Sequence, residues 1–207
     1  HHLNEGIFHS CRLPEVVDAV AAVSQRWPGH ERWLAGFSLG GNFMLRVAAS
    51  GDARIGRLAG VIAVSPVLDP GATLTAMERG LPVYQRYFVR KWAGSLRRKQ
   101  RVWSGRHEFG ELLHWGDLRR MTAALVALHT DYPTMEDYLA GYAITGGRLE
   151  SLAAPAVIIA AKDDPIIPAQ DLARLARNPL LTIVALERGG HLGFMTSVFR
   201  HSWVNDW

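Results

Sequence analysis

The stretch "ERWLAGFSLGGNFMLRVAAS", residues 31–50, decides how this chain is interpreted. An apolar run leads into Gly36-Phe37-Ser38-Leu39-Gly40, which has the pattern G-x-S-x-G, and a second apolar run follows. This arrangement predicts a strand over 33–37, a sharp turn at Ser38 and a helix over 42–49. Such a turn strains the backbone of the serine and lifts its hydroxyl clear of the sheet. The stretch therefore predicts a nucleophilic serine.

The residues around Ser38 fit this interpretation. Side chains two residues before and after the serine would collide in so sharp a bend, which gives glycines at 36 and 40 a steric reason. The free amides at the start of the following helix would point at the same spot, and the N–H of Leu39 would stabilise an oxyanion there. The alternative is that Ser38 only caps the helix. A cap does not require the paired glycines, so the nucleophile is favoured.

Three further stretches have the continuous apolar character of strands buried on both faces of a parallel sheet. They are "LAGVIAVSPVL" (58–68), "PAVIIA" (155–160) and "LTIVAL" (181–186). Helices are predicted over about 14–27 and over 168–178, each opened by a proline. Strands that alternate with helices predict an α/β fold with a mostly parallel, doubly wound sheet.

The segment from 69 to 150 breaks this alternation. It contains no convincing strand and several helical stretches, including 81–103 and 117–130. We therefore predict two parts: a core formed by residues 1–68 and 151–207, and a helical cap formed by residues 69–150. An insertion between two sheet strands is expected above the carboxyl edge of the sheet, where ligands bind in open α/β sheets.

A serine hydroxyl is a poor nucleophile and needs a histidine beside it, oriented in turn by an acid. Both are expected after later strands, in the order Ser, Asp, His. Asp164 lies in "VIIAAKDDPIIP", just after one predicted strand, and His191 lies in "LTIVALERGGHLGF", just after the last one. The alternatives left open are Asp163 and Asp69 for the acid and His9, His114, His129 and His201 for the base. Asn42 is expected to satisfy neighbouring backbone groups.

The chain resembles the α/β-hydrolase superfamily, and within it the esterase/lipase branch of YheT-like hydrolases and plant embryogenesis-associated proteins. The stretches that carry the resemblance are "HLNEGIFHSCRLPEVVDAV", "GFSLGGNFMLR", "VSPVLDP", "YPTMEDYLAGYAI", "AKDDPIIP" and "GGHLGF". The resemblance implies Ser38 as nucleophile, Asp164 as acid and His191 as base. It also implies that residues 69–150 form a cap over the site and that no cofactor is needed.

The sequence departs from this family at its beginning. Members of the family place several strands before the serine turn, whereas here the turn follows one predicted helix and one predicted strand. We therefore expect that the N-terminal strands of the fold are missing and that the loop giving the second oxyanion N–H is absent from this chain. The strand over 33–37 would then be an apolar sheet edge, open to pairing with other chains.

The composition limits the classes of function. The net charge of +4 in 207 residues is too small for a nucleic-acid-binding protein. No apolar run reaches the ~20 residues of a membrane-spanning helix. Cys11 is the only cysteine, which suits a reducing compartment, and we expect a cytoplasmic protein. The stretch "HEFGE" (107–111) lacks the second histidine of a zinc motif, so no metal site is predicted.

The predicted function is a serine hydrolase of carboxylic esters, including lipid or short- and medium-chain acyl esters, with a small-molecule ester as its partner. An acyltransferase with the same triad and a non-catalytic binding module are the alternatives. The predicted helix 81–103 has a broad apolar face with Tyr84, Tyr87 and Trp92, and an opposite stripe of Arg86, Arg90, Arg97 and Arg101. We expect it to pack on the domain or to contact an anionic membrane surface.

Overall fold

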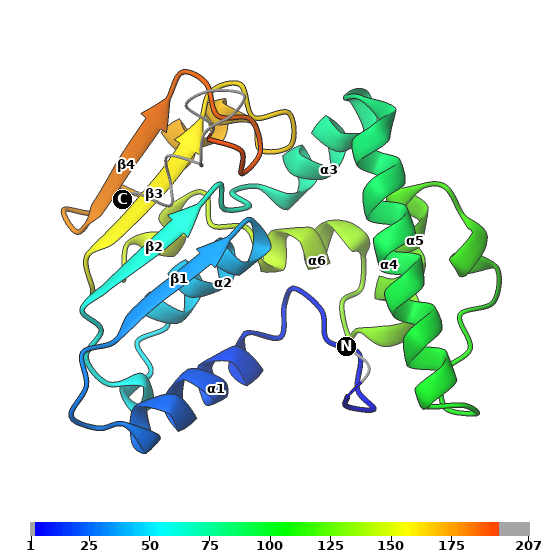
Figure 1. Cartoon of the computed structure of the whole chain (residues 1–207), viewed down its shortest axis with the longest axis horizontal. Coiled ribbons are helices and arrows are strands. Elements are labelled where there is room, and N and C mark those ends of the chain that lie inside the picture. Colours follow the sequence, from blue (N-terminus) through cyan, green and yellow to red (C-terminus); the bar gives the residue numbers. More distant parts are fainter. Residues whose placement is uncertain (1–2, 195–207) are drawn as a thin grey trace.

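The computed structural model describes residues 3–194 and contains one parallel sheet of four strands in the order β1-β2-β3-β4 (Figure 1). The strands are β1 (Trp33–Phe37), β2 (Gly60–Val64), β3 (Ala156–Ala161) and β4 (Leu181–Leu186). Phe37 is in register with Val64, and Val64 with Ile159. All four strands therefore end at the same edge of the sheet, and the segments that follow them meet there.

Helix α2 (Leu39–Ala48) covers one face of the sheet, and α1 (Leu13–Arg26) packs against α2. Helix α1 has a proline in its first turn, and helix α2 begins directly after Ser38. Leu45 and Val47 of α2 are fully buried in a core that also contains Val61 of β2 and Ile158 of β3. Because parallel strands with helices packed on them bury their apolar runs, the apolar sequence of β2 and β3 is explained by this packing.

Between β2 and β3 the chain forms α3 (Pro70–Arg79), α4 (Pro82–Val102), α5 (Leu118–His129) and α6 (Met135–Gly141). The side chains of Asp69, Asp117 and Thr134 accept hydrogen bonds from backbone N–H groups in the first turns of α3, α5 and α6, which satisfies donors that have no partner inside a helix. Figure 1 shows α4 and α5 beside the sheet rather than on it. The division into core and cap at residues 69 and 150 stays a prediction.

The predicted elements differ from the structure at several places. Strand β2 covers only 60–64 of the predicted stretch 58–68. Strand β4 is not buried on both faces as expected, since Ile183 is 39% exposed. The helix after Ser38 begins at Leu39 instead of residue 42. The predicted helix over 168–178 is wrong, since only a short 3₁₀ helix, Ala169–Arg174, forms there. The carbonyl of Arg174 accepts a hydrogen bond from the N–H of Gly146 at 2.8 Å, and Leu175 pairs with Gly146 as an isolated parallel bridge. This long-range pairing holds the chain extended where a helix would have continued.

Strand β1 lies at the edge of the sheet as the structure describes it, as expected from the sequence. The side chains of Trp33 and Phe37 are more than half exposed. They lie on the sheet face opposite Leu34, which packs against the core. The apolar edge predicted for residues 33–37 is therefore confirmed within residues 3–194.

Candidate active site

Ser38 occupies the turn between β1 and α2 and has an unusual backbone conformation. Its φ is 50° and its ψ is −120°, a combination that costs free energy for any residue with a side chain. The neighbouring structure holds it there: the N–H of Ser38 donates to the carbonyl of Val64 at 2.9 Å, and its carbonyl accepts from Asn42 N–H at 3.1 Å. The backbone of Ser38 is thus fastened to both β2 and α2.

Glycines make this turn possible, but only one of the two that the sequence indicated is required sterically. A Cβ on Gly36 would lie 2.4 Å from the backbone carbon of Gly40, so Gly36 has the expected steric reason. A Cβ on Gly40 would meet no atom within 4 Å outside its own helix, and the steric explanation for Gly40 is wrong. The second close approach is at Gly41, where a Cβ would lie 2.9 Å from the carbonyl oxygen of Gly36.

Asp164 and His191 come together in a buried pair. The Nδ1 atom of His191 lies 2.9 Å from Oδ2 of Asp164, and the side chains are 8% and 2% exposed. The other oxygen of Asp164 accepts hydrogen bonds from the N–H groups of Ile166 at 2.8 Å and Ile167 at 3.0 Å. Three hydrogen bonds therefore fix the carboxylate, and the carboxylate in turn fixes the plane of the imidazole ring.

The structure places Ser38, Asp164 and His191 after β1, β3 and β4, at the shared carboxyl edge of the sheet. It joins Asp164 to His191, but no hydrogen bond between Ser38 Oγ and His191 is present within residues 3–194. Catalytic hydrogen bonds are often long in proteins without substrate and shorten when substrate binds. Leu39, the predicted oxyanion donor, is the first residue of α2 and lines the same cavity as Ser38.

The two alternative acids have other partners. Asp69 caps α3 through the N–H of Ala72 at 3.1 Å and forms an ion pair with Arg174 at 2.8 Å. Asp163 Oδ1 accepts hydrogen bonds from the N–H groups of Gly189 and Gly190, both at 2.8 Å, and these bonds lower the pKa of Asp163. Asp163 therefore holds the turn that carries His191.

The alternative bases are dispersed. His9 lines the same cavity as Ser38, and burial lowers its pKa. His114 ends a short 3₁₀ helix, Gly110–His114, and His129 ends α5, where its ring contacts Phe109. His201 lies outside the described residues.

A cavity of about 330 Å³ opens at Ser38. Its walls come from four parts of the chain: the N-terminal segment, the turn at Ser38, the helical segment between β2 and β3, and Ile166 in the loop after β3. Most of the lining side chains are apolar, among them Leu74, Met77, Phe88, Trp92 and Leu139. The volume is at the lower end of the range of about 300–1,000 Å³ found for small-molecule sites, so the cavity suits one apolar group of modest size.

The N-terminal segment is a wall of this cavity that sequence reasoning missed. Phe8, His9 and Ser10 line the cavity. Ile7 is buried among side chains of α4 and α5, and the Nζ atom of Lys99 in α4 donates to the carbonyls of Asn4 and Gly6, the latter at 2.7 Å. Lys99 is only 1% exposed, and a lysine in the middle of a basic helix gives no sequence signal of such burial.

Asn42 has the structural role expected for it. It is fully buried, and its Nδ2 donates to the carbonyls of Val67 and Tyr142, both at 2.8 Å. These bonds connect α2 with the start and the end of the helical segment between β2 and β3. Asn42 therefore positions the walls of the cavity without lining it.

Comparisons with known proteins identify the family of the chain. A model described as "Alpha/beta hydrolase family" matches residues 7–200. The chain is 28% identical over 194 residues to "Putative esterase YheT" of Escherichia coli (strain K12), covering 88% of this chain and 56% of that protein. It is 22% identical over 196 residues to "Phospholipase ABHD3" of Mus musculus, covering 92% of this chain and 47% of that protein. The chain thus spans about half the length of these curated relatives.

A solved structure shares the fold at low sequence identity. The serine hydrolase CCSP0084 from Cycloclasticus zankles aligns with a TM-score of 0.53 and 14% identity, covering 94% of this chain and 69% of that chain. Identity at this level shows a common fold and carries no information on substrate.

Proposed function

Because the chain belongs to the alpha/beta hydrolase family, we propose that it supplies the catalytic residues of a serine hydrolase that cleaves carboxylic esters. Ser38 is the nucleophile, His191 the general base and Asp164 the acid that orients the imidazole. The observation that carries this proposal is the buried contact of 2.9 Å between His191 Nδ1 and Asp164 Oδ2, at the same sheet edge as a serine with φ of 50°.

The assignment follows from the chemistry of each group. With Nδ1 donating to Asp164, the lone pair of His191 is on Nε2, which can accept the proton of the serine hydroxyl. The Asp164 carboxylate stabilises the imidazolium that forms when the proton is transferred. The N–H of Leu39, at the start of α2, stabilises the negative charge that develops on the substrate oxygen.

The reaction proceeds through an acyl-enzyme. Ser38 Oγ attacks the acyl carbon as His191 takes its proton, and the same proton then passes to the leaving alcohol. Water deprotonated by His191 attacks the acyl-enzyme, and the carboxylic acid is released while Ser38 is protonated again. The cavity at Ser38 binds the apolar acyl chain, because its walls are mostly apolar and its volume of about 330 Å³ fits a chain of short or medium length.

A fluorophosphonate probe tests the nucleophile directly, since only an activated serine reacts with it. We expect labelling of the native chain and none of the Ser38→Ala variant. Ser65 provides a matched control, because it also has a positive φ (42°) after a neighbouring strand, but it is fully buried. Labelling that persists in Ser38→Ala, or that disappears in Ser65→Ala instead, would contradict the assignment. The same variants are then compared for hydrolysis of p-nitrophenyl esters.

A further inference from the structure

The outward side of α4 carries an unusual concentration of positive charge. Between Glu78 and Glu108 the sequence has nine lysines and arginines and no acidic residue. Six of them are exposed on one side of α4, which we call the basic face: Arg86, Arg90, Lys91, Arg97, Arg98 and Arg101. Since the net charge of the whole chain is only +4, the rest of the protein has a net negative charge.

Most of this charge is not neutralised within the protein. Arg97 donates to the carbonyl of Leu113. No ion pair or hydrogen bond joins the side chains of Arg86, Arg90, Arg98 or Arg101 to another residue in the described part of the chain. Arginines that stabilise a fold have carboxylate or carbonyl partners, as Arg119 does with Glu78 at 2.8 Å. The basic face therefore presents positive charge to its surroundings.

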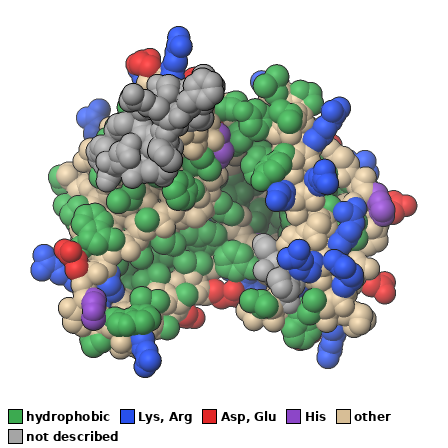
Figure 2. All heavy atoms as spheres, in the orientation of Figure 1, with side chains coloured by type: hydrophobic (Ala, Val, Ile, Leu, Met, Phe, Trp, Pro, Cys, Tyr) green, Lys and Arg blue, Asp and Glu red, His purple; other side chains and the backbone are tan. Residues whose placement is uncertain are grey.

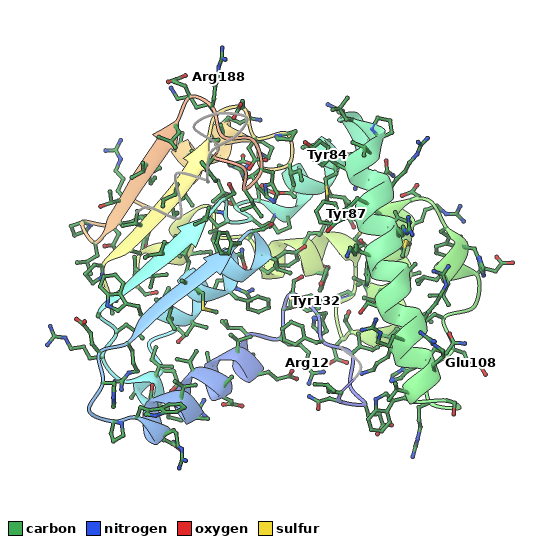
Figure 3. All side chains as sticks on the ribbon, viewed as in Figure 1. Arg12, Tyr84, Tyr87, Glu108, Tyr132 and Arg188 are labelled. Atoms are coloured by element: carbon green, nitrogen blue, oxygen red, sulfur yellow. The ribbon has the colours of Figure 1, made fainter. Side chains whose placement is uncertain are left out.

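Large apolar side chains are exposed among these charges at the beginning of α4. Leu81 is 64%, Val83 62% and Tyr87 55% exposed. The sequence places Tyr87 on the apolar face, but in the structure it lies on the basic face, where Lys91 contacts its ring 5.6 Å from the centroid. Tyr84 and Tyr87 both project from the half of α4 next to α3 (Figure 3).

The basic face borders the route to the candidate active site. The opposite side of α4 contributes Phe88 and Trp92 to the cavity wall. Figure 2 shows the Lys and Arg side chains of this region beside a hollow between α4 and the sheet, on one face of the molecule. A partner that lies against the basic face is thus close to the opening.

We propose that the basic face of α4, with Leu81, Val83 and Tyr87 at one end, docks on the surface of an anionic phospholipid bilayer. The arginines pair with lipid phosphates, and the exposed apolar side chains enter the headgroup region, as in helices that lie in a membrane interface. A bilayer fits better than a nucleic acid, because exposed aliphatic side chains among the charges favour lipid and add nothing to phosphate contacts. None of the helices among residues 3–194 combines the length and apolarity needed to cross a bilayer, so contact through α4 is peripheral.

Binding to vesicles tests the proposal, with Ser38→Ala as the background so that no lipid ester is consumed and docking is measured apart from hydrolysis. We expect sedimentation with vesicles of phosphatidylcholine mixed with phosphatidylglycerol and little with phosphatidylcholine alone. The triple change Arg86→Gln, Arg90→Gln, Arg101→Gln is expected to weaken partitioning roughly 100-fold, because each basic residue near an anionic surface contributes about a factor of five.

The matched control is Arg26→Gln, Arg57→Gln, Arg177→Gln, which removes the same charge from exposed positions outside α4. It is expected to keep nearly all of the binding. Equal loss in both triple variants, or binding to duplex DNA as tight as binding to the anionic vesicles, would overturn the proposal.

A fluorescence measurement tests the same docking surface without changing the arginines. An environment-sensitive nitrobenzoxadiazole probe is attached at Val83→Cys, or at Leu128→Cys as a control that is 68% exposed on α5, both with Cys11→Ser. Vesicles are expected to shift the emission to the blue for position 83 and not for position 128. An unchanged spectrum at position 83 would overturn the docking surface even if some vesicle binding were observed.

Discussion

Asp163 Oδ1 accepts a hydrogen bond of 2.8 Å from the N–H of Gly190, the residue directly before His191. The adjacent residue, Asp164, holds the imidazole of His191 itself. Two neighbouring carboxylates therefore have separate roles: one fixes the turn and the other fixes the side chain that the turn presents.

Replacing Asp163 by Ala is expected to lower kcat for a short-chain ester about 10- to 100-fold, because small displacements of catalytic groups have effects of that order. Asp163→Asn keeps an acceptor oxygen and is expected to retain most of the rate. The N–H groups of Gly189 and Gly190 lower the pKa of Asp163. The stabilisation that the ionised Asp163 carboxylate gives to the folded turn is therefore complete above its ordinary pKa. It is lost only as the pH falls through the lowered pKa. The kcat ratio of native chain to Asp163→Ala should be constant from pH 6 to 9; a change across that range would contradict this role.

The contact between Lys99 and the N-terminal segment predicts a second effect. Lys99→Met would leave the carbonyls of Asn4 and Gly6 without this donor, at a cost of about 2 kcal/mol in the free energy of unfolding. The loosened segment carries Phe8 and Ser10, so KM for an apolar ester should rise more than kcat falls. Urea unfolding and steady-state kinetics measure the two effects, with the exposed Lys91→Met as control. Equal behaviour of the two variants would show that Lys99 does not position the cavity wall.

We expect the side chain of Trp92 in the cavity wall to limit the length of the acyl chain that fits. Trp92→Ala would enlarge the cavity beside Leu74 and Met77, and the preferred p-nitrophenyl ester should become longer by several carbons. Trp27→Ala removes the same side chain from an exposed position outside the cavity. It should leave the profile of kcat/KM against chain length unchanged. A profile for Trp92→Ala identical to that of the native chain would show that the acyl group does not bind in this cavity.

Because of His129, we expect the folded protein to lose stability in mild acid. Its Nε2 is buried without a hydrogen-bond partner in the part of the chain that the structure describes. Burial, and to a lesser degree the nearby His107, lowers its pKa below 6.5. A lowered pKa means that the unfolded chain binds the proton more tightly. The contribution of neutral His129 to the free energy of unfolding is therefore complete above pH 6.5. It decreases as the pH falls toward the lowered pKa.

The change His129→Phe should flatten the dependence of Tm on pH between 7 and 5, while part of the slope remains because burial also lowers the pKa of His9. His30→Gln, at an exposed position, should leave the slope as in the native chain. A slope that is unchanged in His129→Phe would refute this explanation.

The sequence by itself determined the strands, the turn at Ser38 and the order of the candidate residues, because these depend on local apolar patterning and on glycine next to a strained serine. Tertiary structure decided what depends on contacts between distant segments. Asp69 pairs with Arg174 and caps α3, whereas Asp164 forms the buried pair with His191. These partners distinguish the two candidate acids. The bridge between Gly146 and Leu175 ends a helix that the local pattern favoured. Lys99 is buried where its Nζ donates to carbonyls of the N-terminal segment. Spacing along the chain cannot predict such contacts, since their partners are set by packing of the whole fold.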